Sequence, residues 1–315
     1  MKITIQEYTW HLILNPLAMS YKSVDFLHQV ERILKELKID YISHITKELP
    51  ETQKIISSLC LQGERHFIVV GGDGTYNSFV NAIMGSGVNP SDIYMIPIIL
   101  GTGNDWARTH FKKNNFSYTQ QLIVSGLFIK HDIGLVEVWD REILKEKRYF
   151  INIAGFGFDA EVIFNSNDRK PRILPEAVYL FGLLKTLFRH KSNLVTIRTN
   201  GSCFSKDIFS IAVGIGQYNG NGMKQCPKGV PNDQLFEVIM IEKVSKLKVI
   251  LNVMNLFDGS HVEKMKEIFT LKTDYLEIRS NPHLRGEVEG ELLTTGDFKI
   301  SMIKQQINIL SELWS

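Results

Sequence analysis

The sequence of 315 residues predicts two domains, an α/β domain followed by a β-rich domain. Three observations support this fold class. Strand-like and helix-like segments alternate over roughly the first 130 residues. Strand-like segments then follow one another with few helices between them, and the chain is long enough for two domains that each bury a core. We assign 1–133 to the first domain and 134–295 to the second, and treat 296–315 as a C-terminal tail that could pack back on the first.

The α/β alternation is visible in four apolar runs separated by amphipathic stretches. In the first of these stretches, Leu27, Val30 and Leu34 fall at helical spacing. Expected strands occupy 10–15, 40–46, 66–70 and 94–100. Expected helices follow the first three strands, at 24–38, 51–62 and 76–84.

The second half contains six strand-like segments, "DIGLVEVWD", "RYFINIAGFGF", "NLVTIRTNG", "DIFSIAVGIGQY", "LFEVIMIEKV" and "YLEIRS". Two helical candidates, 174–190 and 245–268, interrupt them. The mixed-charge stretch 140–148 is typical of a solvated hairpin.

Composition excludes several classes of protein. The residues are 44% hydrophobic and 22% charged, as in globular domains, and a net charge of +2 does not favour a nucleic-acid partner. Three cysteines without CxxC spacing favour neither a disulfide framework nor a zinc site. The most apolar stretch, 177–188, is too short to span a bilayer. We therefore expect a cytoplasmic protein.

The segment "IVVGGDGTYN" at 68–77 carries the first chemical signal, because a glycine-rich turn after a buried strand lets backbone N–H groups approach a phosphate. It is neither a P-loop nor a GxGxxG fingerprint. An aspartate beside phosphates is tolerable if it binds Mg²⁺ or accepts a proton from a hydroxyl, and Asp73 thus indicates phosphoryl transfer. The alternative is an ordinary strand–turn–helix connection with a turn-forming Asp-Gly.

A second small-residue loop, "PIILGTGNDWAR" at 97–108, also ends a strand and also carries a carboxylate. Loops at the carboxyl ends of parallel strands flank one crevice. Together, "GGDGTYN" and "GTGNDWAR" resemble the diacylglycerol/sphingosine lipid kinase family in its small bacterial form. The segments "AGFGFDAEV", "GQYNGNGMKQCPKGVPNDQLFEV" and "VEGELL" resemble later elements of that family, in the same order.

The resemblance implies a Rossmann-like nucleotide-binding domain of the kind shared with NAD kinases, a sandwich-like second domain, and ATP between them. The positions that match the family's ATP-binding elements are Asn15, Thr46, Gly71, Gly72, Gly74, Thr75, Asn77, Gly101, Thr102, Asn104 and Asp105.

The resemblance also implies a metal site and an acid–base group. Asp233, with the backbone carbonyls of Val230 and Leu235, matches the family's Mg²⁺ ligands. Glu289 and Glu291 match its "D-G-E" element, and we favour Glu291 as the proton acceptor, with Asp73 as the other catalytic carboxylate. The alternative for "GEVEGELL" is a half-buried strand with its glutamates on the solvent face.

Several positions depart from the family pattern. The first element, "NPLAMS", lacks a glycine, Ser78 stands where glutamate is usual, and Asn232 and Gln234 replace an aspartate and a glycine of "DDG". These differences bear on the substrate and on catalytic competence.

The leading functional hypothesis is an ATP- and Mg²⁺-dependent kinase that phosphorylates a diacylglycerol-like lipid hydroxyl at the membrane surface, with peripheral membrane contact and no nucleic-acid partner. The alternatives are an NAD kinase-like enzyme, although no "TxTGS" motif is present, and a non-catalytic nucleotide- or lipid-binding regulator. The stretch 174–191 could present an apolar face to lipid, although a packed helix is favoured. Unpaired strand edges make a homodimer plausible.

Overall fold

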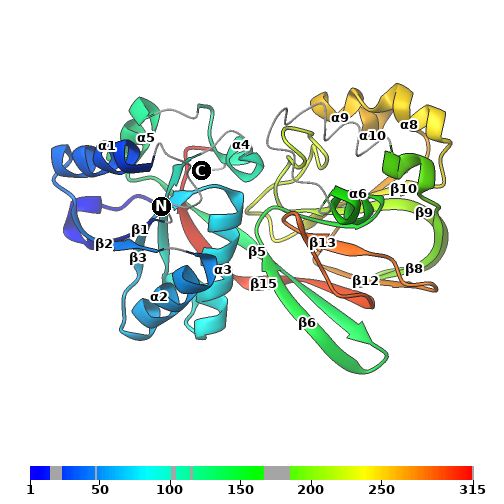
Figure 1. Cartoon of the computed structure of the whole chain (residues 1–315), viewed down its shortest axis with the longest axis horizontal. Helices are drawn as coiled ribbons and strands as arrows, with labels where there is room; N and C mark the ends of the chain where they lie inside the picture. The colour runs from blue at the N-terminus through cyan, green and yellow to red at the C-terminus, as the bar shows by residue number, and fades with distance from the viewer. Residues whose placement is uncertain (15–22, 47, 101–103, 114–115, 167–184, 314–315) are drawn as a thin grey trace. The chain divides into compact units, whose positions relative to one another are not determined.

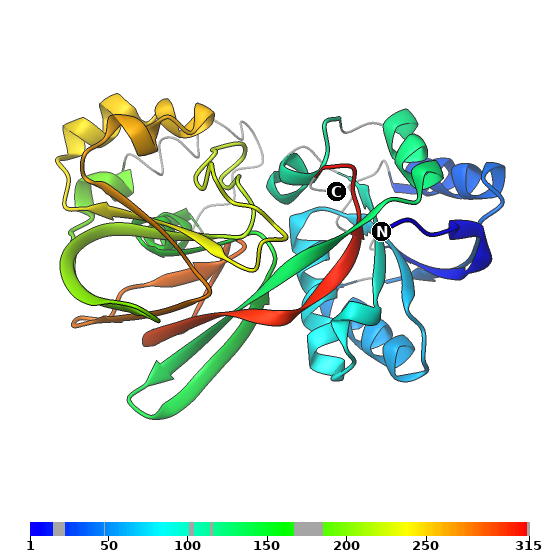
Figure 2. The same ribbon diagram turned by 180° about the vertical axis from the view of Figure 1, so that it is seen from behind.

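The computed structural model describes residues 1–14, 23–46, 48–100, 104–113, 116–166 and 185–313. The chain forms two compact units. The first comprises Met1–Ile133, Pro231–Asp233 and Ile303–Ser315, and the second comprises Gly134–Val230 and Gln234–Met302. We describe each by itself (Figures 1 and 2).

The first unit is built on a parallel sheet with the order β4-β3-β1-β2. The end of the final strand adds to its edge, where Asn308 pairs in parallel with Tyr94. The strands are β1 (Thr9–Leu14), β2 (Asp40–Ile45), β3 (His66–Gly71), β4 (Tyr94–Ile99) and the last part of β15 (Asp297–Leu310). Parallel pairing brings the carboxyl ends of β3 and β4 to the same edge, which is where both small-residue loops begin.

Helices cover both faces of this sheet. Figure 1 shows α2 and α3 on one face and α1 and α5 on the other. A parallel sheet covered in this way has apolar strands on both sides, which explains why Phe67, Ile68 and Val69 are all fully buried. The helices are α1 (Ser23–Glu36), α2 (Leu49–Leu61), α3 (Asp73–Ser86), α4 (Asp105–His110) and α5 (Phe116–Ser125).

The second unit is a β-rich domain built on antiparallel strands. Strand β9 pairs with three others, and the order along the main path is β14-β13-β7-β9-β8-β12-β15. Strands β10 and β11 extend from β9, while β5 and β6 form a long hairpin. The bounds are β5 (Phe128–Asp140), β6 (Ile143–Phe150), β7 (Ile153–Gly157), β8 (Asn193–Thr199), β9 (Cys203–Gly214), β10 (Phe236–Glu242), β11 (Ile268–Thr273), β12 (Tyr275–Ser280), β13 (Gly286–Val288) and β14 (Glu291–Leu292).

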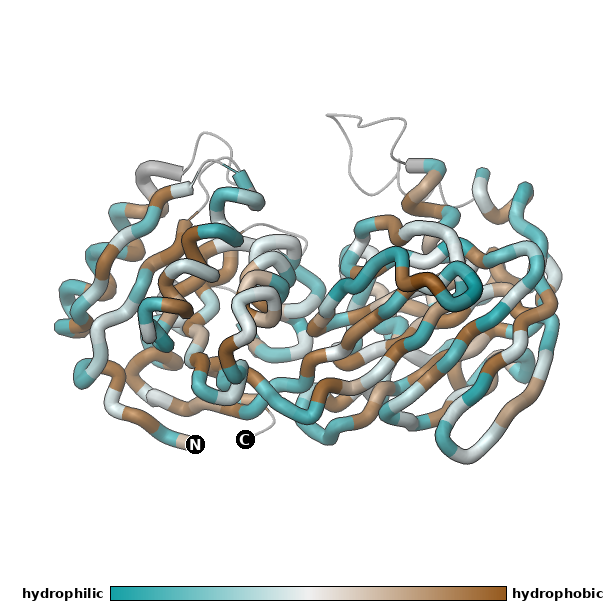
Figure 3. The backbone as a smooth tube through the Cα atoms, turned by 90° about the horizontal axis from the view of Figure 1, so that it is seen from below, coloured by the Kyte–Doolittle hydropathy of each residue, from teal (hydrophilic) through white to brown (hydrophobic). Residues whose placement is uncertain are grey.

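One apolar cluster forms the interior of the second unit. It includes Phe150, Phe156, Phe236 and Phe298, all with no more than 1% of their surface exposed. Figure 3 shows hydrophobic stretches running along the inner elements, with hydrophilic residues on the outer turns. The hairpin expected at 140–148 is confirmed, since Asp140 pairs with Ile143.

Two of the expected helices differ from the structure. The segment 245–268 forms three short helices, α8 (Lys246–Asn252), α9 (Asn255–Asp258) and α10 (His261–Lys264), and then a strand. Gly259, with a φ of 81°, ends the second of them. Of the candidate 174–190, residues 174–184 lie outside the described part, and 185–189 are helical. Within the described residues, no helix is long and apolar enough to cross a bilayer.

Candidate functional site

The glycine loop of the first unit joins the end of β3 to the beginning of α3. Gly72 is the N-cap residue, and no side chain caps the helix. The first N–H groups of a helix have no partner within it, so α3 presents these donors at the carboxyl edge of the sheet. Gly74, in the first turn, is exposed, and an added Cβ there would meet no atom within 4 Å. The loop therefore provides an open, electropositive helix end that suits a phosphate.

Two of the glycines are required by close packing. A Cβ on Gly71 would lie 2.4 Å from Thr75 Oγ1, and a Cβ on Gly72 would lie 2.6 Å from Asn104 Oδ1. Larger residues would therefore push α3 away from its strand and separate the two loops from each other.

The carboxylate of Asp73 joins the two loops. Its Oδ2 accepts a hydrogen bond from the backbone N–H of Asp105 at 2.8 Å, and its Oδ1 accepts one from the N–H of Trp106 at 3.2 Å. These are first-turn groups of α4, so Asp73 caps a helix that lies 32 residues further along the chain. Burial is the main cause that raises the pKa of Asp73 to about 6. The unusual acid in the glycine loop thus has a clear structural partner.

The second loop is held by its own polar contacts. Asn104 Nδ2 donates to the carbonyl of Leu100 at 3.2 Å, and Arg108 lies 3.4 Å from the buried carboxylate of Asp105. Both predicted nucleotide residues of this loop that the structure describes, Asn104 and Asp105, therefore lie next to the glycine loop. The predicted residues Asn15, Gly101 and Thr102 fall outside the described residues.

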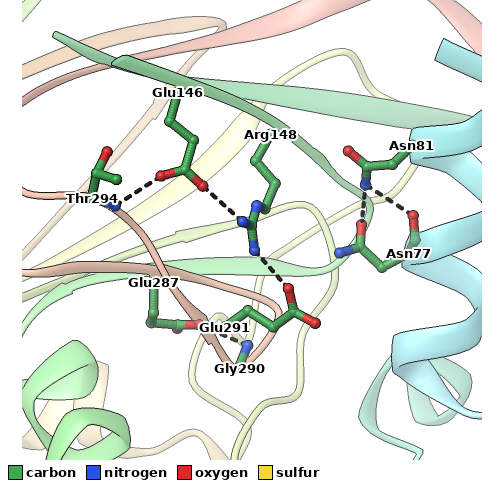
Figure 4. Close-up of polar contacts among 8 residues, drawn as sticks. All are labelled: Asn77, Asn81, Glu146, Arg148, Glu287, Gly290, Glu291 and Thr294. Atoms are coloured by element: carbon green, nitrogen blue, oxygen red, sulfur yellow. Dashed lines mark hydrogen bonds and ion pairs between the residues drawn. The ribbon is translucent and has the colours of Figure 1, made fainter. Parts of the chain in front are cut away.

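The other predicted nucleotide contacts are buried and bonded within the unit. Thr46 Oγ1 lies 2.7 Å from Thr52 Oγ1 and 3.2 Å from the carbonyl oxygen of Leu14. Asn77 accepts a hydrogen bond from Asn81 at 3.0 Å through its side-chain oxygen, as Figure 4 shows. The structure therefore brings Thr75, Asn77, Asn104 and Asp105 to the loop edge and gives Thr46 a role in joining β2 to α2.

The predicted metal ligands lie in the turn before β10. Val230 and Leu235 belong to the second unit and Asp233 to the first. Gln234 adopts a φ of 62°, a left-handed conformation that favours glycine, so the turn keeps this shape without the glycine of "DDG". Among the described residues, no group of three or more His, Cys, Asp or Glu side chains has the arrangement of a metal site.

The acidic segment 286–292 is a tight hairpin between β13 and β14, so the alternative of one half-buried strand with its glutamates on the solvent face does not hold. Glu289 and Gly290 have φ values of 53° and 82°, as a two-residue turn with left-handed central residues requires. The turn breaks the alternation of the segment. Glu287 is consequently buried completely, whereas Glu291 is exposed.

The two predicted catalytic glutamates have separate partners in the second unit. Glu289 Oε1 accepts hydrogen bonds from the backbone N–H groups of Ile151 and Asn152, at 2.9 and 2.7 Å. Glu291, with 62% of its side chain exposed, forms an ion pair with Arg148 at 2.6 Å. Figure 4 shows the same arginine contacting Glu146. These contacts fix the hairpin and balance the charge of Glu291.

Two buried carboxyl groups that the sequence reading did not select face each other across Gly155. A Cβ on this glycine would lie 2.6 Å from Glu287 Oε1 and 3.4 Å from Asp159 Oδ2. Glu287 Oε2 accepts a hydrogen bond from the N–H of Gly290 at 2.8 Å, and Oε1 has no hydrogen-bond partner within the described residues. Gln225 donates to Asp159 Oδ2 at 2.5 Å.

The electrostatic environment raises the pKa of both acids, to different extents. Burial raises the pKa of Glu287 well above its ordinary value, and the nearby Asp159 and Glu289 raise it further. Burial raises the pKa of Asp159 to about 6, while hydrogen bonds from Gln225 and Ser210 oppose the increase. Burial therefore makes both acids hold their protons more tightly than usual, Glu287 more so than Asp159, and two neighbouring acids shifted to different extents suit an acid and a base side by side.

Both carboxyl groups line a cavity of about 230 Å³ inside the second unit. Its walls come from α6 (Phe158–Ser166), strands β9 and β10, helices α8 and α9, and the loop around Gly220. Most of the lining is apolar, and a few polar groups gather at the end formed by Asp159, Ser210, Gln225 and Glu287. Such a cavity suits a ligand with an apolar body and one polar group.

A signal for Asp159 was present in the segment "AGFGFDAEV", where a carboxylate follows two glycines at the end of an apolar run. Glu287 could not be recognised, because its burial depends on the hairpin turn two residues later.

Two family profiles match the chain. The diacylglycerol kinase catalytic domain matches residues 9–136, and the YegS C-terminal NAD kinase beta sandwich-like domain matches residues 152–311, just over half of the chain. Among curated proteins, the "Probable lipid kinase YegS-like" of Yersinia enterocolitica is 26% identical over 88% of this chain and 90% of its own length. The protein of the same name from Pseudomonas putida is 25% identical over 81% and 80%.

Solved structures share the fold. A diacylglycerol kinase from Bacillus anthracis superposes with a TM-score of 0.73 at 17% identity, covering 99% of both chains. Yeast NADH kinase in complex with NADH gives a TM-score of 0.50 at 11% identity, covering 96% of this chain and 83% of that one. These matches confirm the predicted fold class, an α/β domain followed by a β-rich sandwich-like domain. The diacylglycerol kinase catalytic domain profile matches the first part of the chain, and the YegS C-terminal domain profile matches just over half of it. The chain therefore belongs to the diacylglycerol kinase-like family of lipid kinases.

Proposed function

We propose that this protein is an ATP-dependent lipid kinase that transfers the γ-phosphoryl group to the hydroxyl of a diacylglycerol-like acceptor. The observation that carries the acceptor class is the cavity of the second unit, with its apolar walls and two carboxyl groups at one end. Lipid kinase activity at this general level is the activity for which the curated relatives are named.

The donor side rests on the glycine loop. The open end of α3 presents backbone N–H groups, and Gly74 leaves room for a phosphate to approach them. In this proposal Asp73 holds the second loop against the first, so that both contact the nucleotide. Thr75 and Asn77 lie on the first turns of the same helix and complete the donor site.

The acceptor side assigns roles to the buried acids. Asp159, whose pKa is raised less than that of Glu287, accepts the proton of the lipid hydroxyl, and Glu287, whose burial favours the protonated form, donates a hydrogen bond to the acceptor. Glu291 is balanced by Arg148, and we now favour Asp159 over it as the proton acceptor. Phosphoryl transfer needs positioning and charge neutralisation more than covalent help, so these two groups suffice on this side.

A divalent cation would supply the remaining charge neutralisation at the phosphates. The oxygen donors proposed for Mg²⁺ are the Asp233 carboxylate and the backbone carbonyls of Val230 and Leu235, a set that suits a hard cation. The left-handed turn at Gln234 fits this assignment, because a positive φ is the conformation that a glycine at this position would adopt most readily.

The proposal is tested by offering γ-labelled ATP with diacylglycerols of short and long chain length, and with NAD, to the wild type and to Asp159→Asn. We expect label in diacylglycerol and a decrease of about 100-fold or more in kcat/KM for the variant, since general-base catalysis contributes on that order. Asp140→Asn, which removes an exposed carboxylate of the β5–β6 hairpin, is the matched control and should act like wild type. Transfer to NAD alone would overturn the acceptor class, and full activity of Asp159→Asn would remove that residue from the mechanism.

A further inference from the structure

The segment that contains α8 and α9 exposes a row of large apolar side chains, which we call the outer stripe. It consists of Leu247, Leu251, Met254 and Phe257, with exposed fractions of 66, 72, 70 and 48%. The spacing of four, three and three residues places them on one face of a helical path. Val253 and Met254, between the two helices, keep right-handed helical backbone angles, so this path is nearly continuous.

The opposite face of the same segment is also apolar. Val249, Val253 and Leu256 line the cavity of the second unit. A surface helix of a globular protein normally turns polar residues toward water on its outer side. In this segment the solvent-facing residues of the outer stripe are apolar instead. Contiguous exposed apolar residues of this kind mark a site of interaction.

Basic residues flank the outer stripe. Between residues 242 and 267 the chain carries five lysines and four acidic residues, Glu242, Asp258, Glu263 and Glu267. Lys248 is paired with Glu267 at 2.7 Å. Lys246 lies 5.9 Å from the ring centre of Phe188, which is itself 62% exposed and is followed by the exposed Arg189. The surroundings of the stripe are therefore net positive.

We infer that the outer stripe docks on a bilayer that contains anionic lipid. Apolar side chains ringed by lysines are the composition of a segment that lies in a membrane interface, with its apolar face among the acyl chains and its cations near the headgroups. The inference rests on the proposed function, because a lipid acceptor must reach the cavity that the inner face of this segment lines. Figures 1 and 2 show α8, α9 and α10 lying together along one side of the second unit.

The experiment measures flotation of the protein with phosphatidylcholine vesicles, with and without phosphatidylglycerol, in the absence of nucleotide. A triple variant, Leu247→Ser with Leu251→Ser and Met254→Ser, should lower the partition coefficient on anionic vesicles by about tenfold or more. The control triple, Leu61→Ser with Val124→Ser and Ile143→Ser, removes equally exposed apolar residues elsewhere and should bind like wild type. Urea unfolding of each variant shows whether it remains folded.

Unchanged flotation of the outer-stripe variant would overturn the inference, and so would an equal loss in the control. If the wild type is a dimer and the outer-stripe variant a monomer, the stripe is an interface between copies, and the inference is wrong. Failure of the kinase proposal is separable, because flotation is measured without ATP. Turnover of a water-soluble short-chain diacylglycerol should stay at the wild-type rate in the outer-stripe variant, since its three residues face away from the cavity.

Discussion

At position 74, helix stability favours alanine, whereas the binding of a phosphate favours glycine. Among the residues that the structure describes, none lies within 4 Å of an added Cβ, and alanine is preferred over glycine inside a helix by roughly 0.5–1 kcal/mol. The open space exists at the point where α3 offers its first N–H groups. The packing of the described residues does not require glycine at position 74. A ligand that approaches the backbone closely would require it.

We therefore expect Gly74→Ala to be as stable as wild type or more stable, and yet to bind ATP at least about tenfold more weakly. Gly85→Ala is the matched control, because Gly85 lies near the other end of the same helix and also has no atom within 4 Å of its Cβ position. Calorimetric titration with ATP and urea unfolding report both quantities. Equal ATP affinity in the two variants would show that no phosphate approaches Gly74.

Glu287 gives the stability of the protein a pH dependence of known sign. Its pKa in the folded state is raised well above the ordinary value of 4.5, so the folded chain holds a proton that the unfolded chain has released. The contribution is fully present below pH 4.5 and is lost as the pH rises toward the raised value. Glu287→Gln keeps the size of the side chain and remains neutral.

The free energy of unfolding of the wild type should consequently fall more between pH 5 and pH 8 than that of Glu287→Gln. From pH 5 up to the raised pKa of Glu287, the difference should grow by on the order of 1 kcal/mol per pH unit. Urea unfolding at several pH values measures it. Glu142→Gln, at an exposed position of the β5–β6 hairpin, should leave the pH profile unchanged, and parallel profiles for wild type and Glu287→Gln would contradict the assignment.

At the scale of elements, the β13–β14 hairpin depends on a carboxylate that binds backbone. Glu289 accepts hydrogen bonds from two N–H groups at the end of β6, and these donors would stay unpaired after truncation. Glu291, two residues away, makes only an exposed ion pair. The two glutamates of one turn thus contribute very unequally to stability.

Glu289→Ala should lower the free energy of unfolding by about 3 kcal/mol or more, since two hydrogen bonds to a charged group are lost, each worth roughly 1.5–3 kcal/mol, and alanine retains the Cβ that makes the positive φ unfavourable. Glu291→Ala should change it by less than about 1 kcal/mol. Chemical denaturation of both variants provides the comparison. Equal losses would mean that the hairpin is held by its charge balance with Arg148.

The elements show where the sequence was sufficient. The spacing of apolar residues and the positions of glycines predicted the parallel strands and their helices. For example, Phe67 to Val70 form a continuous apolar run, as a strand buried on both faces requires, and glycines follow it directly. The single helix expected at 245–268 was wrong because Gly259 ends it, and its apolar residues face two sides. The different environments of Glu287 and Glu291 were inaccessible for a related reason, since the left-handed turn at Glu289 and Gly290 puts Glu291 on the opposite face from Glu287 and breaks the alternation that the sequence suggested.

At the scale of the molecule, the two units carry different candidate sites, and ligands should act on them separately. A ligand that binds the folded chain stabilises it by about 2.7 kcal/mol at 100 times its dissociation constant. We expect ATP to slow hydrogen exchange in α3 and α4, and a short-chain diacylglycerol to slow it in α6, α8 and the hairpin. Mass spectrometry of deuterium uptake distinguishes these regions, and protection of α6, α8 and the β13–β14 hairpin by ATP without diacylglycerol would contradict the assignment.

The long strand β15 has a consequence for how the chain is made. Its beginning pairs with β12 of the second unit, and Asn308 and Ile309 complete the edge of the first unit beside β4. The ribosome supplies these residues after strands β1 to β14. Until then β4 has an unpaired edge, which can recruit strands from other nascent chains. The sheet of the first unit is therefore complete only after the second unit has been synthesised. A premature stop shortly before residue 303 should yield an aggregation-prone product and not a folded first unit.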